Sequence, residues 1–204
     1  IGPDGHVIDV GANIGYHALY AATLTRGPVV AFETEPHNFA MLSENIVLNG
    51  ASNVEARFEA CGDAPGRLEL HLNPDNAGDH RLWAAGDHAR QSLEVTVVRV
   101  DDALPGITNV SFIKIDVQGY EMPVFRGMKQ TFENNPNVVI VSEFWPAGLA
   151  AAGSSAVACL DFMESLGFHW SVIDDLHDRV TVMDRAAVLQ KCGPNGFVDL
   201  LFRR

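Results

Sequence analysis

The stretch VIDVGANIG, residues 7–15, decides the fold class of this chain. Residues 7–10 are short, apolar and β-branched, a glycine-containing turn follows, and apolar residues then recur at helical spacing over residues 14–24. A glycine-rich turn between a strand and a helix lets the backbone approach a ligand closely, and the helix N-terminus attracts negative charge. The stretch therefore predicts the first strand–turn–helix unit of an α/β protein, with a candidate binding turn.

The sequence beyond this unit repeats the same alternation. Residues 29–32 predict a second buried strand, residues 36–48 a second helix, and residues 54–60 a third strand. Pro36 is favoured in the first turn of a helix, and Asn49-Gly50 is a favoured stop signal. Alternating strands and helices are typical of a parallel sheet whose faces are covered by helices.

The alternation is interrupted in the middle of the chain and then resumes. Residues 68–72 and 93–100 alternate as half-exposed strands do, and a segment rich in Asn, Asp, Gly and His separates them at residues 73–91. That segment is too long for an ordinary connection, which indicates a functional or mobile loop. Further strands are predicted at residues 110–116, 138–144, 168–173 and 197–202, and a helix at 156–166. One doubly wound domain over residues 1–204 accounts for this order.

The composition excludes several classes of protein. With 47% hydrophobic and 20% charged residues, the 204-residue chain resembles an ordinary globular domain. Its net charge of −12 opposes binding to nucleic acid or to an anionic membrane. Three cysteines without a C-x-x-C pair, and histidines without ligand-like spacing, predict no metal site and a reducing, cytoplasmic location. Strand-like sequence begins by His6 with no signal peptide before it, which indicates a trimmed N-terminus.

An acidic residue closes the second predicted strand. Glu33 follows Gly11 by 22 residues, the interval at which a strand-end carboxylate binds the hydroxyls of a ribose in dinucleotide-binding folds. A lone strand-end glutamate is more often a solvated surface group. After this glycine-rich turn, however, it predicts a nucleoside-containing cofactor at the carboxyl ends of the strands.

A lysine lies inside the apolar strand predicted at residues 110–116. Lys114 and Asp116 share one face of that strand because alternate side chains point the same way. A buried lysine is costly unless it is paired, and Asp116, Glu121 and Glu143 are the candidate partners. The group is either a structural ion-pair network or the rim at which chemistry takes place.

Together these motifs resemble the FkbM type of class I S-adenosylmethionine-dependent methyltransferases. The matching stretches are VIDVGANIGYHAL (7–19), VVAFETEPHNFAMLSENIVLNG (29–50), EACGD (59–63), VRVDDAL (98–104) and FIKIDVQGYEMPVFRGM (112–128). Gln118 stands where the family more often has glutamate. The fold we expect is therefore a single Rossmann-like methyltransferase domain with a mostly parallel seven-stranded sheet, an antiparallel last strand, and an inserted β-hairpin and loop around residues 66–100.

The resemblance implies S-adenosylmethionine as the cofactor and a set of residues that bind it. In this implied arrangement the glycine-rich turn surrounds the methionyl part, Asp9 holds the turn or the amino group, and residues 61–63 lie near the adenine. The implied cofactor-binding residues are Asp9, Gly11, Asn13, Gly15, Glu33, Cys61, Asp63 and Asp116. The positive charge of a sulfonium suits an acidic rim, whereas the pyrophosphate of a nicotinamide dinucleotide does not.

The resemblance also implies methyl transfer to a hydroxyl oxygen of a small molecule or glycan. A hydroxyl acceptor needs a group that takes its proton, and Asp116, Glu143 and His80 are the candidates. In the inserted loop His80, Arg81 and Trp83 lie close together, and Trp83 can stack on the acceptor. The alternative is a solvated loop whose tryptophan packs on the core.

Other functions compete with O-methylation. The sequence is also compatible with N-methylation. A non-catalytic module that binds the cofactor is a further alternative, which the intact carboxylates Asp116, Glu121 and Glu143 oppose. A nicotinamide-dependent oxidoreductase is the third, but the turn lacks the further glycine that its fingerprint needs. The sequence identifies neither the acceptor nor an oligomeric state.

Overall fold

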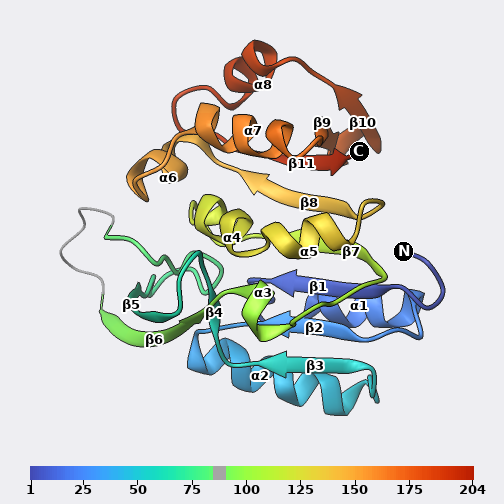
Figure 1. Ribbon diagram of the computed structural model, residues 1–204. Coiled ribbons are helices and arrows are strands. Elements are labelled where there is room, and N and C mark those ends of the chain that lie inside the picture. Colours follow the sequence, from blue (N-terminus) through green and yellow to red (C-terminus); the bar gives the residue numbers. More distant parts are fainter. Residues whose placement is uncertain (85–90) are drawn as a thin grey trace.

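The largest element of the structure is a mixed sheet of eight strands in the order β10-β9-β11-β8-β7-β1-β2-β3 (Figure 1). The computed structural model describes residues 1–84 and 91–204; residues 85–90, part of the loop expected at 73–91, lie outside the described residues. The strands of this sheet are β1 (His6–Val10), β2 (Val29–Phe32), β3 (Val54–Arg57), β7 (Val110–Ile115), β8 (Val139–Phe144), β9 (His169–Asp174), β10 (Arg179–Val182) and β11 (Val198–Arg203).

Strand direction places the carboxyl ends of the central strands together. The neighbours β3, β2, β1, β7 and β8 are parallel, whereas β11 runs antiparallel to both β8 and β9, and β10 antiparallel to β9. The chain order changes direction between β1 and β7, since β2 lies on one side of β1 and β7 on the other. In open α/β sheets such a switch point, at the carboxyl ends, is where ligands bind.

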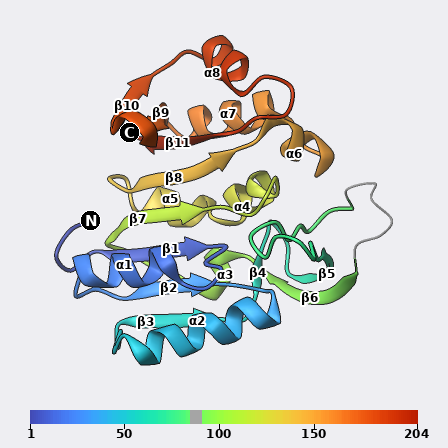
Figure 2. The same cartoon turned by 180° about the vertical axis from the view of Figure 1, so that it is seen from behind.

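Helices cover both faces of the sheet. On one face α1 (Tyr16–Leu24) and α2 (Pro36–Leu48) pack against residues such as Val7, and they lie in front in Figure 2. On the other face Ile8 belongs to a core built with α3 (Val100–Ala103), α4 (Glu121–Gly127), α5 (Lys129–Asn134) and α7 (Ala156–Ser165). The remaining helices are α6 (Pro146–Ala151), η1 (Asp175–His177) and α8 (Arg185–Cys192). No helix within the described residues is long and apolar enough to cross a membrane.

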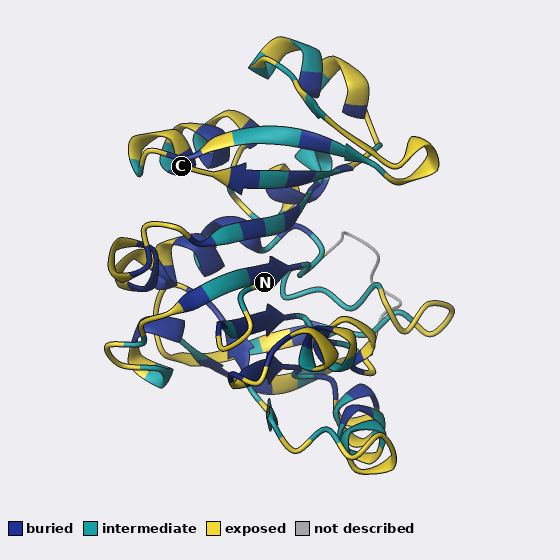
Figure 3. Cartoon of the chain, turned by 90° about the vertical axis from the view of Figure 1, so that its right-hand side faces the viewer, coloured by how far each residue is buried: buried dark blue, intermediate teal, exposed yellow. Residues whose placement is uncertain are grey.

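An inserted three-stranded sheet stands beside the arrowheads of β1 and β2 (Figure 1). It contains β4 (Ala60–Cys61), β5 (Gly66–His71) and β6 (Ser92–Val98), in the order β4-β6-β5. The strands β5 and β6 form an antiparallel hairpin, and the insertion has its own small core of Ala60, Leu70, Val95 and Val97. Figure 3 shows buried residues concentrated in the central strands and exposed ones on the outer helix faces.

The fold class, the inserted hairpin and the antiparallel last strand are confirmed, but three details of the sheet differ from expectation. The sheet has eight strands rather than seven, because β10 pairs with β9 after a turn in which Asp178 adopts φ 47°. The strand expected at residues 54–60 ends at Arg57, and Ala60 then pairs with Val97 in the second sheet. The strand expected at 93–100 ends at Val98, since α3 begins at Val100. The place of Ala60 depends on long-range pairing, which local patterns do not reveal.

The buried carboxylate of Asp101 on α3 stabilises the start of α5, and its removal tests how much this contact contributes to stability. It accepts hydrogen bonds from the backbone N–H groups of Gln130 and Thr131 and from the Thr131 hydroxyl, at 2.8–2.9 Å. Because Asp101→Ala leaves these donors at the start of α5 unpaired, we expect it to lower the free energy of unfolding by about 2–4 kcal/mol. Urea unfolding measures this loss. The neighbouring exposed residue supplies the control, Asp102→Ala, and an equal loss in both variants would contradict the expectation.

Candidate functional site

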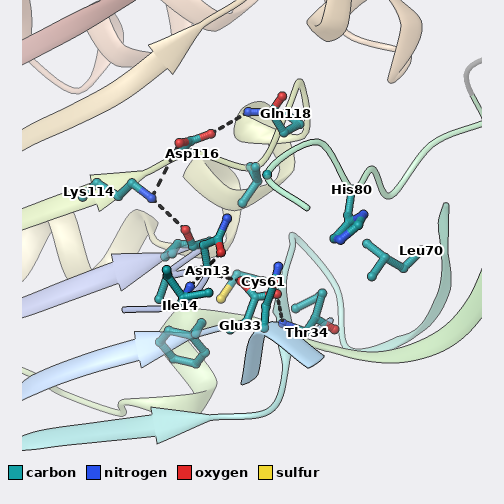
Figure 4. A pocket seen from close by; sticks show the side chains of 18 of the residues that line it. Asn13, Ile14, Glu33, Thr34, Cys61, Leu70, His80, Lys114, Asp116 and Gln118 are labelled. Atoms are coloured by element: carbon teal, nitrogen blue, oxygen red, sulfur yellow. Dashed lines mark hydrogen bonds and ion pairs between the residues drawn. The ribbon is translucent and has the colours of Figure 1, made fainter. Parts of the chain in front are cut away.

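A cavity of about 300 Å³ lies at the carboxyl ends of β1, β2 and β7 (Figure 4). Its wall combines the sheet and the insertion. The sheet contributes the turn after β1 and the ends of β2 and β7, and the insertion contributes β4, one residue of β5 and part of the loop before residue 83. The cavity therefore occupies the switch point of the sheet, covered by the inserted segment.

The turn after β1 is shaped by left-handed backbone conformations. Gly11 and Asn13 have φ of 77° and 52°. A Cβ on Gly11 would come within 2.0 Å of the carbonyl oxygen of Asp116, so only glycine fits where the turn passes the end of β7. The N–H groups of Gly11 and Ala12 both donate to the carbonyl of Phe32, at 3.0 and 2.9 Å. The turn is thereby fixed between β2 and β7 with its backbone against the cavity.

Glu33 is held at the end of β2 by three backbone donors. Its Oε2 accepts from the N–H of Asn13 at 2.7 Å, and its Oε1 accepts from Thr34 and Glu35 at 3.0 and 2.8 Å. Burial raises the pKa of this carboxyl, and the three hydrogen bonds oppose that shift. Since a carboxylate oxygen accepts about two hydrogen bonds, Oε2 retains capacity for one further donor from a ligand in the cavity.

Lys114 connects the turn to two carboxylates. Its Nζ donates to the carbonyl of Gly11 at 2.7 Å and lies 3.4 Å from Asp9 and 3.7 Å from Asp116. Burial alone would lower the pKa of Lys114, but the attraction of Asp9 and Asp116 outweighs it and raises the pKa. The ion-pair network expected from the sequence motif is therefore present, and one of its members, Asp116, faces the cavity. A role for this group in chemistry stays a prediction.

Further acidic side chains gather beyond Asp116, where β7 and β8 end. The amide Nε2 of Gln118 donates to Asp116 at 2.8 Å and lies 3.4 and 3.5 Å from the two carboxylate oxygens of Glu143. Burial and repulsion from Asp116 raise the pKa of Glu143 to about 8. Glu121 is fully buried against the backbone at residues 117–119, and burial raises its pKa to about 7. This end of the site can therefore hold a proton near neutral pH.

Residues 73–83 of the insertion, here called the strap, are attached to the body at two points. The indole Nε1 of Trp83 donates to the carbonyl of Gln118 at 2.8 Å, and the amide of Asn38 donates to the carbonyl of Ala77 at 3.0 Å. Between these points the strap contributes four residues to the cavity wall, which are Ala77, Gly78, His80 and Leu82. The strap thus forms one side of the cavity.

The hydrogen bonding of His80 defines its chemistry. Its Nδ1 accepts from the N–H of Asn73 at 3.0 Å. In the neutral ring the proton is therefore on Nε2, which acts as a donor. A role for His80 in catalysis stays a prediction.

Arg81 and Trp83 form a cluster with Trp145 at the start of α6. The guanidinium carbon of Arg81 lies 4.9 Å from the ring centre of Trp83 and 4.8 Å from that of Trp145. Arg81 also donates to Asp79 at 2.6 Å. Trp83 therefore packs against Trp145 and the backbone of Gln118, and a stacking contact with an acceptor stays a prediction.

The structure brings about half of the predicted site residues to the cavity wall. Those that line it are Gly11, Asn13, Glu33, Cys61, His80 and Asp116. Those that do not are Asp9, Gly15, Asp63, Glu143, Arg81 and Trp83. Asp9 lies behind Lys114, Gly15 packs against Leu42, and Asp63 faces Arg126 at 3.8 Å.

Several wall residues were not assigned to the site from the sequence. Leu70 and Leu82 supply apolar surface from the insertion, and Asn38 both lines the cavity and anchors the strap. His17 on α1 also lines the cavity. The alternation of β5 places Leu70 on the inward face of a half-exposed strand, but only the tertiary packing shows that it is buried and what it faces.

Fold and site together define an α/β protein with a ligand cavity of the kind found in Rossmann-like methyltransferases. The family model of the methyltransferase FkbM domain matches residues 9–170. The chain belongs to this family, which confirms the resemblance carried by the three motifs and supports S-adenosylmethionine as its cofactor.

Two curated relatives extend the comparison. The hexuronic acid methyltransferase AglP of Haloferax volcanii is 29% identical over 136 residues, covering 65% of this chain and 53% of AglP. The 2-O-methyltransferase NoeI of Sinorhizobium fredii is 30% identical over 149 residues, covering 63% of this chain and 59% of NoeI. The chain thus spans little more than half the length of these relatives.

A solved structure shows the same fold. The protein SMU.1697c of Streptococcus mutans, determined in complex with SAH, has a TM-score of 0.56 and 11% identity. The alignment covers 99% of this chain and 90% of that chain. The Rossmann-like arrangement is therefore shared over essentially the whole sequence.

The raised pKa of Glu121 predicts a pH-dependent stability. Between the ordinary value of 4.5 and about 7 the folded chain holds a proton that the unfolded chain has released, so the free energy of unfolding falls as pH rises. We expect this residue to contribute a decrease of roughly 3 kcal/mol between pH 5 and 8. Urea unfolding at both pH values should show a smaller decrease in Glu121→Gln than in the unmodified chain.

The exposed Glu133 on α5 supplies the control for this measurement. Glu133→Gln makes the same chemical change at a solvated site and should leave the pH dependence as it is in the unmodified chain. The same decrease in both glutamine variants would show that Glu121 titrates normally in the folded protein.

Proposed function

We propose that residues 1–204 form one methyltransferase domain that transfers a methyl group from S-adenosylmethionine to a hydroxyl oxygen of a small molecule or glycan. The observation that carries the proposal is the cavity at the switch point, where the glycine turn, Glu33 and Asp116 meet. The cavity wall contains backbone groups, carboxylates and apolar side chains, so it can contact both the polar and the apolar parts of a ligand. Membership in the FkbM family supports the same reaction.

The residues of the cavity fit this cofactor. Gly11 lets the turn pass β7 and keeps its backbone at the cavity wall, and Oε2 of Glu33 can accept one ribose hydroxyl. Cys61 and Leu70 offer an apolar surface suited to an adenine, and burial keeps the Cys61 thiol neutral by raising its pKa. When bound, S-adenosylmethionine supplies a methyl group activated by a positively charged sulfonium. The carboxylate of Asp116 at the rim complements that charge.

Support for an oxygen acceptor comes from the relatives and from the carboxylates. One relative is named a 2-O-methyltransferase and the other a hexuronic acid methyltransferase. A hydroxyl oxygen must lose its proton as it is methylated, and we propose that Asp116 or Glu143 takes that proton. His80 lines the strap side of the same cavity, where it would contact the acceptor. The net charge of −12 favours a small acceptor over a nucleic acid.

Calorimetric titration tests the cofactor directly. The purified chain is titrated with S-adenosylmethionine and, in parallel, with NADH. Micromolar binding of the first and none of the second is expected. A folded chain, verified by its cooperative melting, that binds NADH or binds neither compound would contradict the proposal.

Glu33 provides the first site prediction. Glu33→Gln should weaken S-adenosylmethionine binding by about 10–100-fold, because a charge-assisted hydrogen bond contributes about 1.5–3 kcal/mol. The matched control is Glu55→Gln, at an exposed position on β3. Calorimetry gives both affinities, and melting curves show that the variants are folded. An affinity equal to that of the control would remove Glu33 from the cofactor site.

Asp116 provides the second site prediction. Asp116→Asn should lower turnover by at least about 100-fold while changing cofactor affinity less than about fivefold, since a proton acceptor acts on the reaction step. Turnover is measured as release of S-adenosylhomocysteine with a panel of hydroxyl-bearing glycosides and amines. Parallel losses of turnover and affinity would make Asp116 a binding residue. Turnover with amines alone would replace O-methylation by N-methylation.

A further inference from the structure

Gln118 makes two kinds of contact that the reaction scheme above does not use. Its backbone has φ 54°, a left-handed conformation that is uncommon for a residue other than glycine. In this conformation its backbone carbonyl accepts a hydrogen bond from the indole N–H of Trp83. Its side chain points toward the acidic rim, where Nε2 donates to Asp116 (Figure 4). Strained backbone of this kind persists where the surroundings hold it in place, often at functional sites.

We propose that Gln118 is a positioning residue whose side-chain amide bridges Asp116 and Glu143 and holds these two carboxylates together at the rim of the cavity. The amide lies 2.8 Å from Asp116 and 3.4 Å from the nearer oxygen of Glu143. Glu143 does not itself line the cavity, so the bridge is what connects it to the wall. That the pair takes a proton from an acceptor rests on the proposed function, whereas the bridge does not.

The surroundings of Glu143 explain why a donor is needed there. Asp116 at the end of β7, Glu121 on α4 and Asp199 on β11 all act on it with negative charge, and Asp199 is its direct neighbour across the β8–β11 ladder. Burial and the charges of Asp116 and Asp175 raise the pKa of Asp199, and Lys114 and His17 oppose that shift. The hydrogen bond from the amide of Gln118 opposes the repulsion at Glu143.

The identity of residue 118 therefore matters to the chemistry of the rim. Glutamine offers two N–H donors to the neighbouring carboxylates, whereas a glutamate of the same shape offers none and adds a negative charge. A methionine of similar length removes the donor without adding charge. These two substitutions separate the hydrogen bond from the shape of the side chain.

Titration of the Glu143 carboxyl by carbon-detected NMR tests the bridge without an acceptor or cofactor. Glu143→Gln assigns the resonance. In Gln118→Glu the titration midpoint should rise by about one pH unit or more, and in Gln118→Met it should rise by a smaller amount. The controls are Gln190→Glu and Gln190→Met at an exposed position on α8, which should leave the midpoint unchanged.

The outcomes are distinct from those of the cofactor titration. A midpoint for Glu143 that stays the same in Gln118→Met, the variant that keeps size and charge, would overturn the bridge even if Gln118→Glu does not fold. A raised midpoint in a chain that does not bind S-adenosylmethionine would support the bridge and reject the proposed function. In Gln118→Asn we expect the midpoint of Glu143 to rise as well, because the shorter side chain does not span both carboxylates.

Discussion

The site depends on one buried ammonium group. Lys114 lies in the middle of the sheet, where an unpaired charge would be prohibitively costly. It is accommodated because Asp9 on the neighbouring strand and Asp116, directly after the end of its own strand, lie within 4 Å. The same ammonium donates to the carbonyl of Gly11, the residue whose missing side chain lets the turn pass β7. The same lysine therefore joins the two carboxylates inside the sheet and fixes the turn that shapes the cavity.

The second half of the site is built outside the main sheet. The insertion supplies an apolar surface through Leu70 and Leu82, and its strap is attached at Asn38 and Gln118, which belong to different sides of the cavity. The main sheet thus provides the glycine-rich turn, and the insertion encloses the cavity beside it. Loops added to a rigid scaffold are where such folds acquire their substrate preference.

Acidic groups at the rim differ in their partners. Asp116 is placed between the ammonium of Lys114 and the amide of Gln118. Glu121 is fully buried and Glu143 half-buried, neither forms a salt bridge within the described residues, and their pKa values are raised to about 7 and about 8. Environments that separate the pKa values of neighbouring carboxyls are characteristic of sites that move protons.

The sequence by itself determined the features that depend on local order along the chain. The alternation of strands and helices, the turn at residues 11–15, the start of α2 at Pro36 and the place of Glu33 follow from spacing and residue type, because neighbours in sequence fix these geometries. Only the tertiary structure decided which strand Ala60 joins, that Asp63 faces Arg126, and that Glu143 reaches the site through Gln118. Those contacts join residues far apart in the chain or turn a side chain away from the cavity. They are favoured by packing and charge pairing between distant segments, which the local sequence does not specify.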